Sequence, residues 1–329
     1  MVITKTPFRM SFFGGGTDME FWFRKHGGAV LSTTFNHYCY VIVRRLPPFF
    51  DYSTELAYQQ IERVGDVEQI RHPAIRNAMK MLNIRHIRLT YDANLPARAG
   101  LGSSSSFAVG MLAAFHAMRG EHADKRRLAD EAIYLERELC KEAGGWQDQI
   151  AAAFGGLNRI DFDAQGYRVS PIKISPERKQ ALQDRLLLFF TGFTRFSSDV
   201  HAANKLDQGS KEAFLQSMYD LVDRAEIVLS DRQADLDEFG VLLDQTWRLK
   251  RQTGPAVSTS GIDEAYERGI TAGALGGKLL GAGGGGFLLF YVRPEQRGAV
   301  KQAMKAFLRI PFAFEEAGSQ ILYHASERE

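Results

Sequence analysis

Cysteine is scarce in this chain of 329 residues, which contains only Cys39 and Cys140. The two residues form no CxxC pair, and their spacing is not that of metal ligands. A disulfide framework and a cysteine-based metal site are therefore not expected. Both thiols are expected to be reduced and buried, as is usual inside the cell.

An excess of charge is also missing, since 41 basic residues face 39 acidic ones and the formal net charge is +2. Nucleic-acid-binding proteins usually carry a clear basic excess or stripe, so we expect no nucleic-acid partner. No apolar run reaches the ~18 residues of a spanning helix, and the first residues do not resemble a signal peptide. We expect a cytoplasmic protein with no membrane partner, and the sequence leaves a homodimer open.

Strand-like and helix-like segments are interleaved without regular alternation, which favours an α+β fold over a doubly wound sheet. Length favours two domains, and the stretch from Pro171 to Lys179 suits a boundary, giving domains 1–178 and 179–329. Strands are predicted at 2–13, 29–46, 85–93, 156–162, 167–174 and from 185, with a glycine-rich hairpin at 278–292 and short closing strands. Helices are predicted at 73–83, 103–118, 124–142, 197–206, 211–230, 235–252, 261–273 and 294–308, with a short segment at 146–153.

A serine tract, Ser103 to Ser106, follows Gly100-Leu101-Gly102 and leads into the apolar segment 103–118. The glycines allow a tight turn, and Ser103 suits the N-cap of a buried helix. The free N–H groups of the first turn bind anions, and serine hydroxyls add donors or ligate Mg²⁺. The tract therefore predicts a phosphate-binding loop, although a well-capped structural helix is the alternative. The GxxxxGK[ST] motif of common nucleotide-binding loops is absent.

Two further glycine-rich segments need an explanation. In "KLLGAGGGGFLLF", a hairpin accounts for two glycines, and the others indicate close packing against a ligand or another backbone. In "PFRMSFFGGGTDMEFW", Asp18 either caps the segment that starts near Met19 or accepts hydrogen bonds from substrate hydroxyls. Arg9 in the same segment suits a phosphate or a carboxylate.

Two acidic residues lie between the second and third glycine-rich segments. Glu136 is at the border of an apolar helix face, where a buried carboxylate needs a metal or a base as partner; a surface salt bridge is the alternative. Asp148 follows two glycines and is not part of a charge run. Two carboxylates, a phosphate loop and a substrate carboxylate together suggest phosphoryl transfer.

These segments resemble the three signature motifs of the GHMP kinases, the superfamily of galactokinase, homoserine kinase and mevalonate kinase. "TPFRMSFFGGGTD", "LPARAGLGSSSSFA" and "KLLGAGGGGF" occur in the order of those motifs. Within the superfamily, "KTPFRMSFFGGGTD" and "EAGGWQDQIAAAFGG" are most similar to the D-glycero-D-manno-heptose 7-phosphate kinases. The resemblance implies a two-domain fold, with an N-terminal domain like the second domain of ribosomal protein S5 and a ferredoxin-like C-terminal domain.

The resemblance also implies an activity: transfer of the ATP γ-phosphoryl group, with Mg²⁺, to the anomeric hydroxyl of a heptose 7-phosphate. The product would be heptose 1,7-bisphosphate, a precursor of GDP-heptose for surface polysaccharides. Asp148 and Arg9 would be catalytic. Glu136 and one serine of Ser103 to Ser105, with Ser104 preferred, would bind the metal. The expected ATP phosphate-binding residues are Gly100, Leu101, Gly102, Ser103, Ser104, Ser105 and Ser106. The expected substrate-binding residues are Gly15, Gly16, Thr17, Asp18, Arg195, Gly283 and Gly284.

The family pattern is not matched everywhere, because Gly15-Gly16 stands where galactokinase has Glu-His, which leaves room for a larger sugar. We assign Arg195, with Ser197 and Ser198 at the start of a predicted helix, to the phosphate of the sugar. Two alternatives stay open, a fucokinase- or galactokinase-like sugar 1-kinase and a non-catalytic sensor of ATP and sugar on the same fold. A dinucleotide-binding oxidoreductase is not favoured, because no GxGxxG follows a strand with an acidic residue ~20 positions later.

Overall fold

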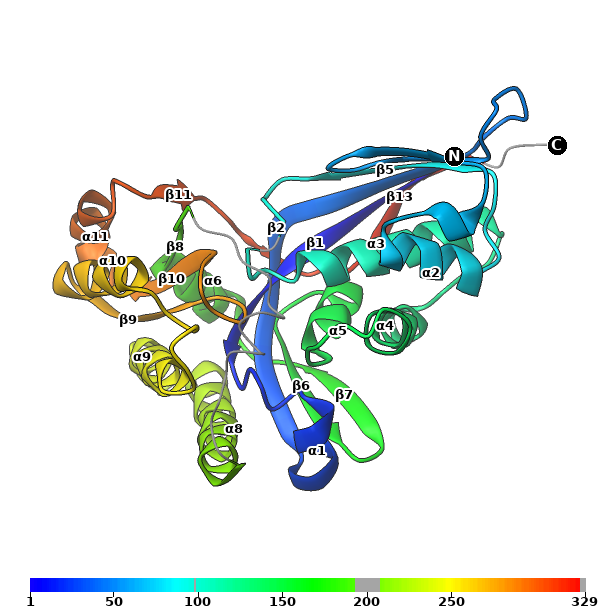
Figure 1. The fold of residues 1–329 in the computed structure, drawn as a ribbon. Coiled ribbons are helices and arrows are strands. Elements are labelled where there is room, and N and C mark those ends of the chain that lie inside the picture. The colour runs from blue at the N-terminus through cyan, green and yellow to red at the C-terminus, as the bar shows by residue number, and fades with distance from the viewer. Residues whose placement is uncertain (98, 193–207, 326–329) are drawn as a thin grey trace.

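The computed structural model describes residues 1–97, 99–192 and 208–325, and it is built on two antiparallel-rich sheets. The strands of the larger sheet are β1 (Val2–Phe13), β2 (Gly28–Arg45), β3 (Thr54–Ala57), β4 (Ile61–Val64), β5 (Ile87–Ala93), β6 (Asn158–Asp163), β7 (Gly166–Pro171), β12 (Phe314–Glu315) and β13 (Gln320–His324). They are ordered β13-β1-β2-β5-β3-β4, with β12 and β6 also beside β2 and β7 beside β6. The long pair β1–β2 carries this sheet across the molecule (Figure 1).

Helices cover one face of the larger sheet (Figure 1). They are α2 (Pro73–Met81), α3 (Ser103–Met118), α4 (Lys125–Ile133) and α5 (Gln147–Phe154), while α1 (Glu20–His26) lies beyond the end of β1. Helix α3 is apolar nearly all round, and residues 105–117 are buried, as the sequence predicts. Its position against β1 places the serine tract beside the first glycine-rich segment.

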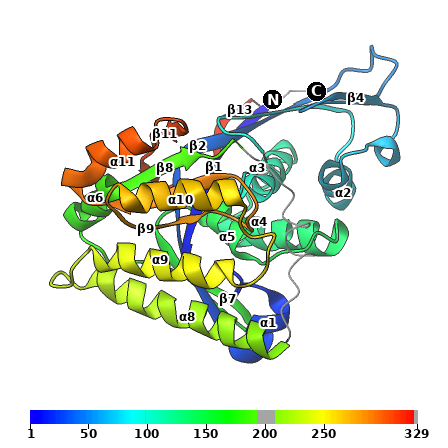
Figure 2. The same ribbon diagram turned by 60° about the vertical axis from the view of Figure 1, so that its left-hand side comes forward.

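The smaller sheet is ordered β11-β8-β10-β9. Its strands are β8 (Leu186–Phe190), β9 (Ala274–Leu279), β10 (Phe287–Val292) and β11 (Leu308–Ile310). Helices α9 (Glu238–Arg251) and α10 (Ser260–Thr271) pack on this sheet, while α8 (Gln208–Ser230) packs on α9, β1 and β2. Helix α6 (Pro176–Arg185) precedes β8, and α11 (Arg297–Ala303) precedes β11. Helices α8 and α9 lie side by side (Figure 2), and the predicted glycine-rich hairpin is β9–β10.

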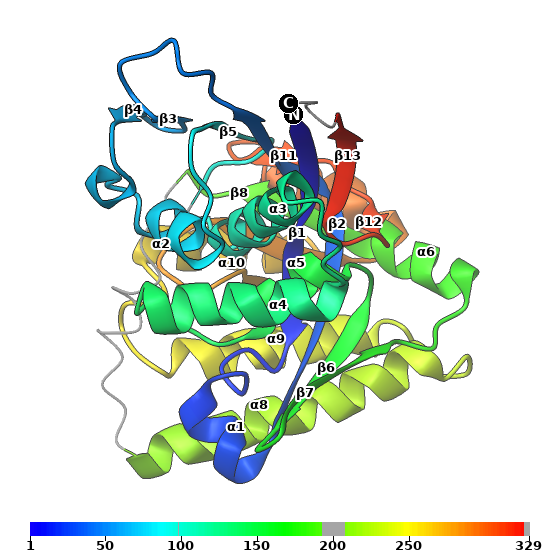
Figure 3. The ribbon, with the colours of Figure 1, turned by 90° about the vertical axis from the view of Figure 1, so that its right-hand side faces the viewer.

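The last strands, β12 and β13, return to the larger sheet from the far side of the predicted division at residue 178. Strand β13 pairs with β1 and β12 pairs with β2, so that Val2 lies beside His324 and β13 runs next to β1 (Figure 3). The Met1 amino group donates to the Ala325 carbonyl at 2.9 Å. Residues on both sides of the predicted division thus belong to one sheet, and the two domains 1–178 and 179–329 stay a prediction.

Several local predictions also change. The predicted helix 124–142 is α4 followed by a π-helical segment, η2 (Tyr134–Leu139), and the predicted helix 294–308 is only a 3-10 turn, η3 (Pro294–Gln296), plus α11. Elements without a strong sequence pattern were missed, namely α1, β3, β4, η1 (Val67–Gln69) and α6. The predicted helix 197–206 lies outside the described residues. Cys39 is buried and Cys140 is half-buried, and both thiols are free. Among the described helices, none is long and apolar enough to cross a membrane.

Candidate active site

A cavity of about 1230 Å³ lies where the three glycine-rich segments meet. The first segment contributes Arg9, Gly15, Gly16 and Asp18, and the second contributes Gly100, Gly102 and Ser103 to Ser105. The third contributes Gly281, Gly283 and Gly285, and the two predicted acids, Glu136 and Asp148, also line the wall. Most of the predicted site residues are thus brought to one place.

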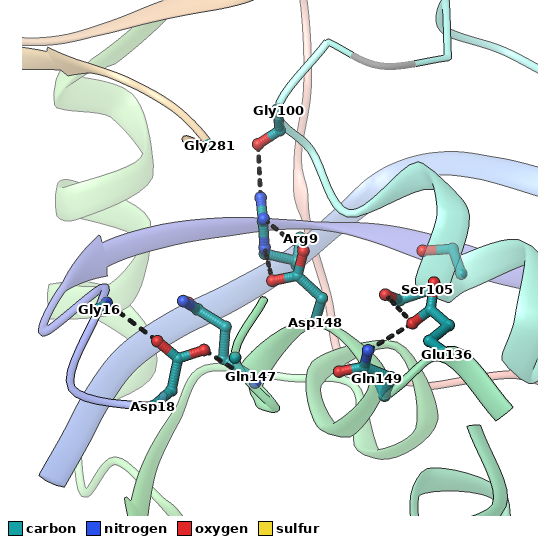
Figure 4. Close-up of polar contacts among 12 residues, drawn as sticks. Arg9, Gly16, Asp18, Gly100, Ser105, Glu136, Gln147, Asp148, Gln149 and Gly281 are labelled. Atoms are coloured by element: carbon teal, nitrogen blue, oxygen red, sulfur yellow. Dashed lines mark hydrogen bonds and ion pairs between the residues drawn. The ribbon is translucent and has the colours of Figure 1, made fainter. Parts of the chain in front are cut away.

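Arg9 and Asp148 occupy the middle of this set (Figure 4). The Arg9 guanidinium donates to both carboxylate oxygens of Asp148, from Nε at 2.8 Å and from Nη2 at 2.7 Å. Its Nη1 donates to the Gly100 carbonyl at 2.6 Å, which ties the pair to the serine loop. Arg9 is almost fully buried on β1, whereas a quarter of the Asp148 side chain is exposed, in the first turn of α5. The carboxylate is held rigidly and still faces the cavity.

Glu136 and Ser105 lie on one side of this pair (Figure 4). The Ser105 hydroxyl donates to Glu136 Oε2 at 2.7 Å, and the Gln149 amide donates to the same oxygen. Burial raises the pKa of Glu136, whereas the Arg137 guanidinium and the Ser105 hydroxyl act in the opposite direction. The nearest described cation is Arg137 Nη2 at 4.0 Å, too far for a hydrogen bond.

These two side chains fit a magnesium ion, which prefers oxygen ligands and neutralises a buried carboxylate. Of the serines that the sequence leaves open for the metal, Ser105 lies nearest to Glu136 by its hydrogen bond. Ser105 contacts Glu136, whereas Ser104 is exposed at the cavity wall. Glu136 is on the π-helical segment η2, and such segments are frequent at functional sites. The alternative of a surface salt bridge for Glu136 is wrong, since only 1% of the residue is exposed.

Asp18 lies on the opposite side of Arg9 and Asp148 (Figure 4). Its Oδ1 accepts from the Gly16 N–H at 2.9 Å and its Oδ2 accepts from the Gln147 N–H at 3.2 Å. Burial raises the pKa of Asp18, and the charge of Asp148 adds to this, while the two N–H groups act against it. Asp18 does not cap α1, which begins at Glu20 without a side-chain cap.

The third glycine-rich segment packs against the second. A Cβ added to Gly281 would lie 2.3 Å from the Cα of Gly100, and one added to Gly286 would lie 2.2 Å from the Ala99 carbonyl oxygen. Gly281 also has a positive φ of 81°, which side chains rarely adopt. Gly281 and Gly286 therefore allow the backbones of the second and third glycine-rich segments to touch, and this contact forms part of the cavity wall.

Some predicted residues do not line the cavity, namely Thr17, Leu101, Ser106 and Gly284. Ser106 donates its hydroxyl to the Pro7 carbonyl and its N–H to the Gly102 carbonyl, both at 2.9 Å, so both of its donors are used inside the fold. The Thr17 hydroxyl donates to the Gly14 and Ala29 carbonyls. Ser103 is the first residue of α3 and not its N-cap, since that position is held by Gly102 in a left-handed conformation. Arg195, Ser197 and Ser198 lie outside the described residues.

Sequence reasoning missed two lysines of the wall, Lys250 on α9 and Lys278 on β9. Lys250 belongs to the basic run "RLKR", which is typical of a solvated helix end, and Lys278 has only its place before the third glycine-rich segment as a signal. Ser11 and Gln147 also line the cavity and were not singled out. Four aromatic side chains were missed at another part of the wall, Tyr58, His72, Tyr91 and Phe107.

Comparison with known families agrees with this arrangement. The model "GHMP kinases N terminal domain" matches residues 69–156 and the model "GHMP kinases C terminal" matches residues 227–310. A D-glycero-alpha-D-manno-heptose 7-phosphate kinase of Campylobacter jejuni is 31% identical over 317 residues, which cover 92% of each chain. The chain belongs to the GHMP kinases. It is thus an α+β kinase of the family that uses ATP as phosphate donor, and the family resemblance is confirmed.

Solved structures of GHMP kinases share the fold. A putative sugar kinase from Campylobacter jejuni is 26% identical, with a TM-score of 0.75 and coverage of 97% of both chains. A D-glycero-D-manno-heptose 1-phosphate kinase from Bacteriodes thetaiotaomicron superposes with a TM-score of 0.80 over 99% of this chain and 100% of the other, at 24% identity.

By sequence, a bifunctional fucokinase/GDP-fucose pyrophosphorylase of Arabidopsis thaliana is also similar. It is 30% identical over 62% of this GHMP kinase and 20% of the plant protein.

Proposed function

We propose that this GHMP kinase transfers the γ-phosphoryl group of ATP to the anomeric hydroxyl of D-glycero-D-manno-heptose 7-phosphate, giving heptose 1,7-bisphosphate. The observation that carries the proposal is the position of Asp148, held by Arg9 between the Ser105–Glu136 pair and Asp18 (Figure 4). A donor phosphate on one side and a sugar on the other would meet at this carboxylate. The name of the Campylobacter relative supports the choice of sugar.

The donor side is assigned to the N-terminus of α3. Ser103, Ser104 and Ser105 of its first turn line the cavity, and the N–H groups and hydroxyls of such a turn suit ATP phosphates. Glu136 and Ser105 would hold Mg²⁺, and the metal would neutralise phosphate charge. The aromatic side chains Tyr58, Tyr91 and Phe107 offer flat apolar surface in the same cavity, which suits a nucleobase.

Asp148 would orient the anomeric hydroxyl and accept its proton. A carboxylate has about four lone-pair sites, and the two hydrogen bonds from Arg9 leave the others for the substrate. Asp18 would accept hydrogen bonds from sugar hydroxyls, since the Gly16 and Gln147 N–H groups fix its direction. Catalysis then depends mainly on positioning, as expected for phosphoryl transfer.

A panel of acceptors tests the proposal. Heptose 7-phosphate, the unphosphorylated heptose, L-fucose and D-galactose are each supplied with MgATP, and ADP release and the phosphorylated product are measured. We expect the highest kcat/KM for heptose 7-phosphate, with product phosphate at C1. Preference for free fucose would favour the fucokinase alternative, to which the plant relative points. Binding of both ligands without turnover would favour the sensor alternative.

The proposed reaction also implies a role for its product in the cell. Heptose 1,7-bisphosphate would serve the synthesis of GDP-heptose for surface polysaccharides. Three further points remain predictions. A cytoplasmic location is tested by cell fractionation, and the absence of nucleic-acid and membrane partners is tested by retention on nucleic acid or on vesicles. A homodimer in solution is tested by light scattering.

A further inference from the structure

Two lysines line the cavity, and neither has a carboxylate partner among the residues that the structure describes. Lys278 is 3% exposed, and its Nζ donates to the Ser11 carbonyl at 2.9 Å and to the Phe12 carbonyl at 2.8 Å. Lys250 is partly exposed, and its Nζ donates to the Gly281 carbonyl. Within residues 1–97, 99–192 and 208–325, neither lysine forms an ion pair. Each ammonium group has three donors, so one remains on Lys278 and two remain on Lys250.

The surroundings of these lysines are positively charged. Burial and, after it, the charge of Arg9 lower the pKa of Lys250 to about 8, while the charge of Asp18 acts in the opposite direction. The pKa of Lys278 is also lowered by burial, and by the charges of Lys250 and Arg9. A buried cation without a counter-charge destabilises a fold unless an anion completes the site. A buried lysine and a partly exposed one in the same cavity wall, neither paired with a carboxylate of the described residues, therefore indicate an anionic ligand.

The position of Lys278 separates this ligand from the donor phosphates. Helix α3 meets β1 on the near side of Arg9, where the Ser106 hydroxyl donates to Pro7. Lys278 contacts β1 beyond Arg9, at the carbonyl groups of Ser11 and Phe12. These residues lie two and three positions after Arg9, which is roughly 7–10 Å along a strand at its usual rise per residue. Strand β1 runs from the Ser105 side toward Gly16 and Asp18 (Figure 4). Lys278 is thus on the sugar side of the catalytic pair.

A buried hydroxyl at the same point has no partner. Ser11 is 6% exposed, and its Oγ forms no hydrogen bond within the described part of the chain. It lines the cavity close to Gly15, where an added Cβ would lie 3.8 Å both from this Oγ and from Gln147 Nε2. An unpaired buried hydroxyl costs free energy, so it too is best explained by a ligand.

We propose that Lys278, Lys250 and Ser11 bind the phosphate group of the phosphorylated sugar. This inference rests on the proposed function, since it requires an acceptor that already carries a phosphate. The ammonium groups supply charge-assisted hydrogen bonds, and the hydroxyl supplies a neutral one. The acceptor then spans from Asp148, where its anomeric hydroxyl reacts, to the lysines, where its far end is held.

The test compares Lys278→Met, Lys250→Met and Ser11→Ala with the matched control Lys305→Met, an exposed lysine outside the cavity. KM and kcat are measured for heptose 7-phosphate, for the unphosphorylated heptose and for ATP. Loss of one charged hydrogen bond should raise KM for heptose 7-phosphate about 10- to 100-fold. KM for ATP and KM for the free heptose should change less than about threefold, and the control should match the wild type. Lys250→Arg, which keeps the charge, should recover part of the affinity.

The outcomes distinguish the inference from the proposed function. If the wild type phosphorylates heptose 7-phosphate but the variants keep its KM, the lysine site is wrong and the proposed function stands. If KM for ATP rises instead, the lysines bind donor phosphate and the inference is overturned. If the wild type phosphorylates only unphosphorylated sugars, both fail. Should Lys278→Met lose its cooperative thermal transition, Lys250→Met and Ser11→Ala decide, because Lys250 is partly exposed and Ser11→Ala removes a hydroxyl without a partner.

Discussion

Arg9 holds both carboxylate oxygens of Asp148, although the two residues are 139 positions apart in the chain. The guanidinium is on β1 and the carboxylate is in the first turn of α5, so the pair joins the strand to the helix. Its third hydrogen bond, from Arg9 Nη1 to the Gly100 carbonyl, adds the serine loop. The geometry of the Asp148 carboxylate, which we propose to be catalytic, therefore depends on three separate elements at once.

Replacement of Asp148 by Asn should lower kcat by roughly 10²- to 10⁴-fold, the usual cost of losing an acid–base group. The amide keeps the size of the side chain but accepts no proton from the anomeric hydroxyl. Binding of a non-hydrolysable ATP analogue, measured by calorimetry, should remain within a few-fold of the wild type. Turnover close to that of the wild type would remove Asp148 from the mechanism.

The matched control for this substitution is Arg9→Met, alone and together with Asp148→Asn. If the two residues act as a unit, the double variant should lose little more kcat than the more damaged single variant. Additive losses would mean that Arg9 acts on the substrate independently of Asp148.

Removal of the Glu136 carboxylate should affect the metal requirement. Glu136→Gln keeps the contact with Ser105 but loses the charge, so the Mg²⁺ concentration for half-maximal activity should rise at least ~10-fold. The variant without ligands should be as stable as the wild type or more stable, because a buried carboxylate without a close cation is costly. Thermal unfolding with and without Mg²⁺ and nucleotide checks both points.

Ser105→Ala and Ser104→Ala are the paired controls for the metal site. Ser105 touches Glu136 and Ser104 does not, so only Ser105→Ala should raise the Mg²⁺ requirement. The reverse order would restore the sequence-based choice of Ser104.

The contact between Gly100 and Gly281 should not tolerate a side chain. In Gly281→Ala the new Cβ would lie 2.3 Å from the Gly100 Cα, at a φ of 81°. The left-handed conformation alone costs about 1–2 kcal/mol, and the clash adds to it. We expect Tm to fall by at least about 2–4 °C and the affinity for nucleotide to weaken. The matched control is Gly298→Ala on α11, where no atom lies within 4 Å of the added Cβ; it should be neutral or slightly stabilising.

The pKa of Lys250 predicts how pH affects use of the acceptor. Its value of about 8 lies below that of an ordinary lysine, so the free enzyme loses this charge as pH rises through 8. Besides burial, the charges that act on it are those of Arg9 from β1 and Asp18 from the loop after β1, and Lys250 itself lowers the pKa of Lys278 on β9. We expect kcat/KM for heptose 7-phosphate to fall above pH 8, while KM for ATP stays constant.

Lys250→Arg is the control for this profile, since a guanidinium stays protonated throughout the range. Its alkaline decline should move to higher pH. Measurements should begin above pH 7, because a phosphate monoester itself titrates near 6. A profile that is flat to pH 9.5 in the wild type would show that the charge of Lys250 does not bind the acceptor.

Helices and strands with a clear residue pattern could be predicted from the sequence, because their formation depends mainly on neighbouring residues. The apolar run after the serines makes 103–118 a buried helix, and the alternating and β-branched segments make β1, β2, β5 and the β9–β10 hairpin. Short or irregular elements such as β3, β4 and α1 have weak periodicity, so they were missed. The π-helical segment at Glu136 follows the same apolar pattern as an ordinary helix, and its change of pitch was therefore invisible.

The sequence by itself determined the three glycine-rich segments, their order and the two acids between them, and these were enough to indicate phosphoryl transfer and the family. Only the tertiary structure decided that Asp148 pairs with Arg9, that Ser105 rather than Ser104 meets Glu136, and that β13 returns to β1. It also decided that Lys250 and Lys278 face the cavity. The physical reason is the separation along the chain of the residues that interact. Periodicity and capping report on residues a few positions apart, whereas burial and pairing of charges depend on which distant segments pack together.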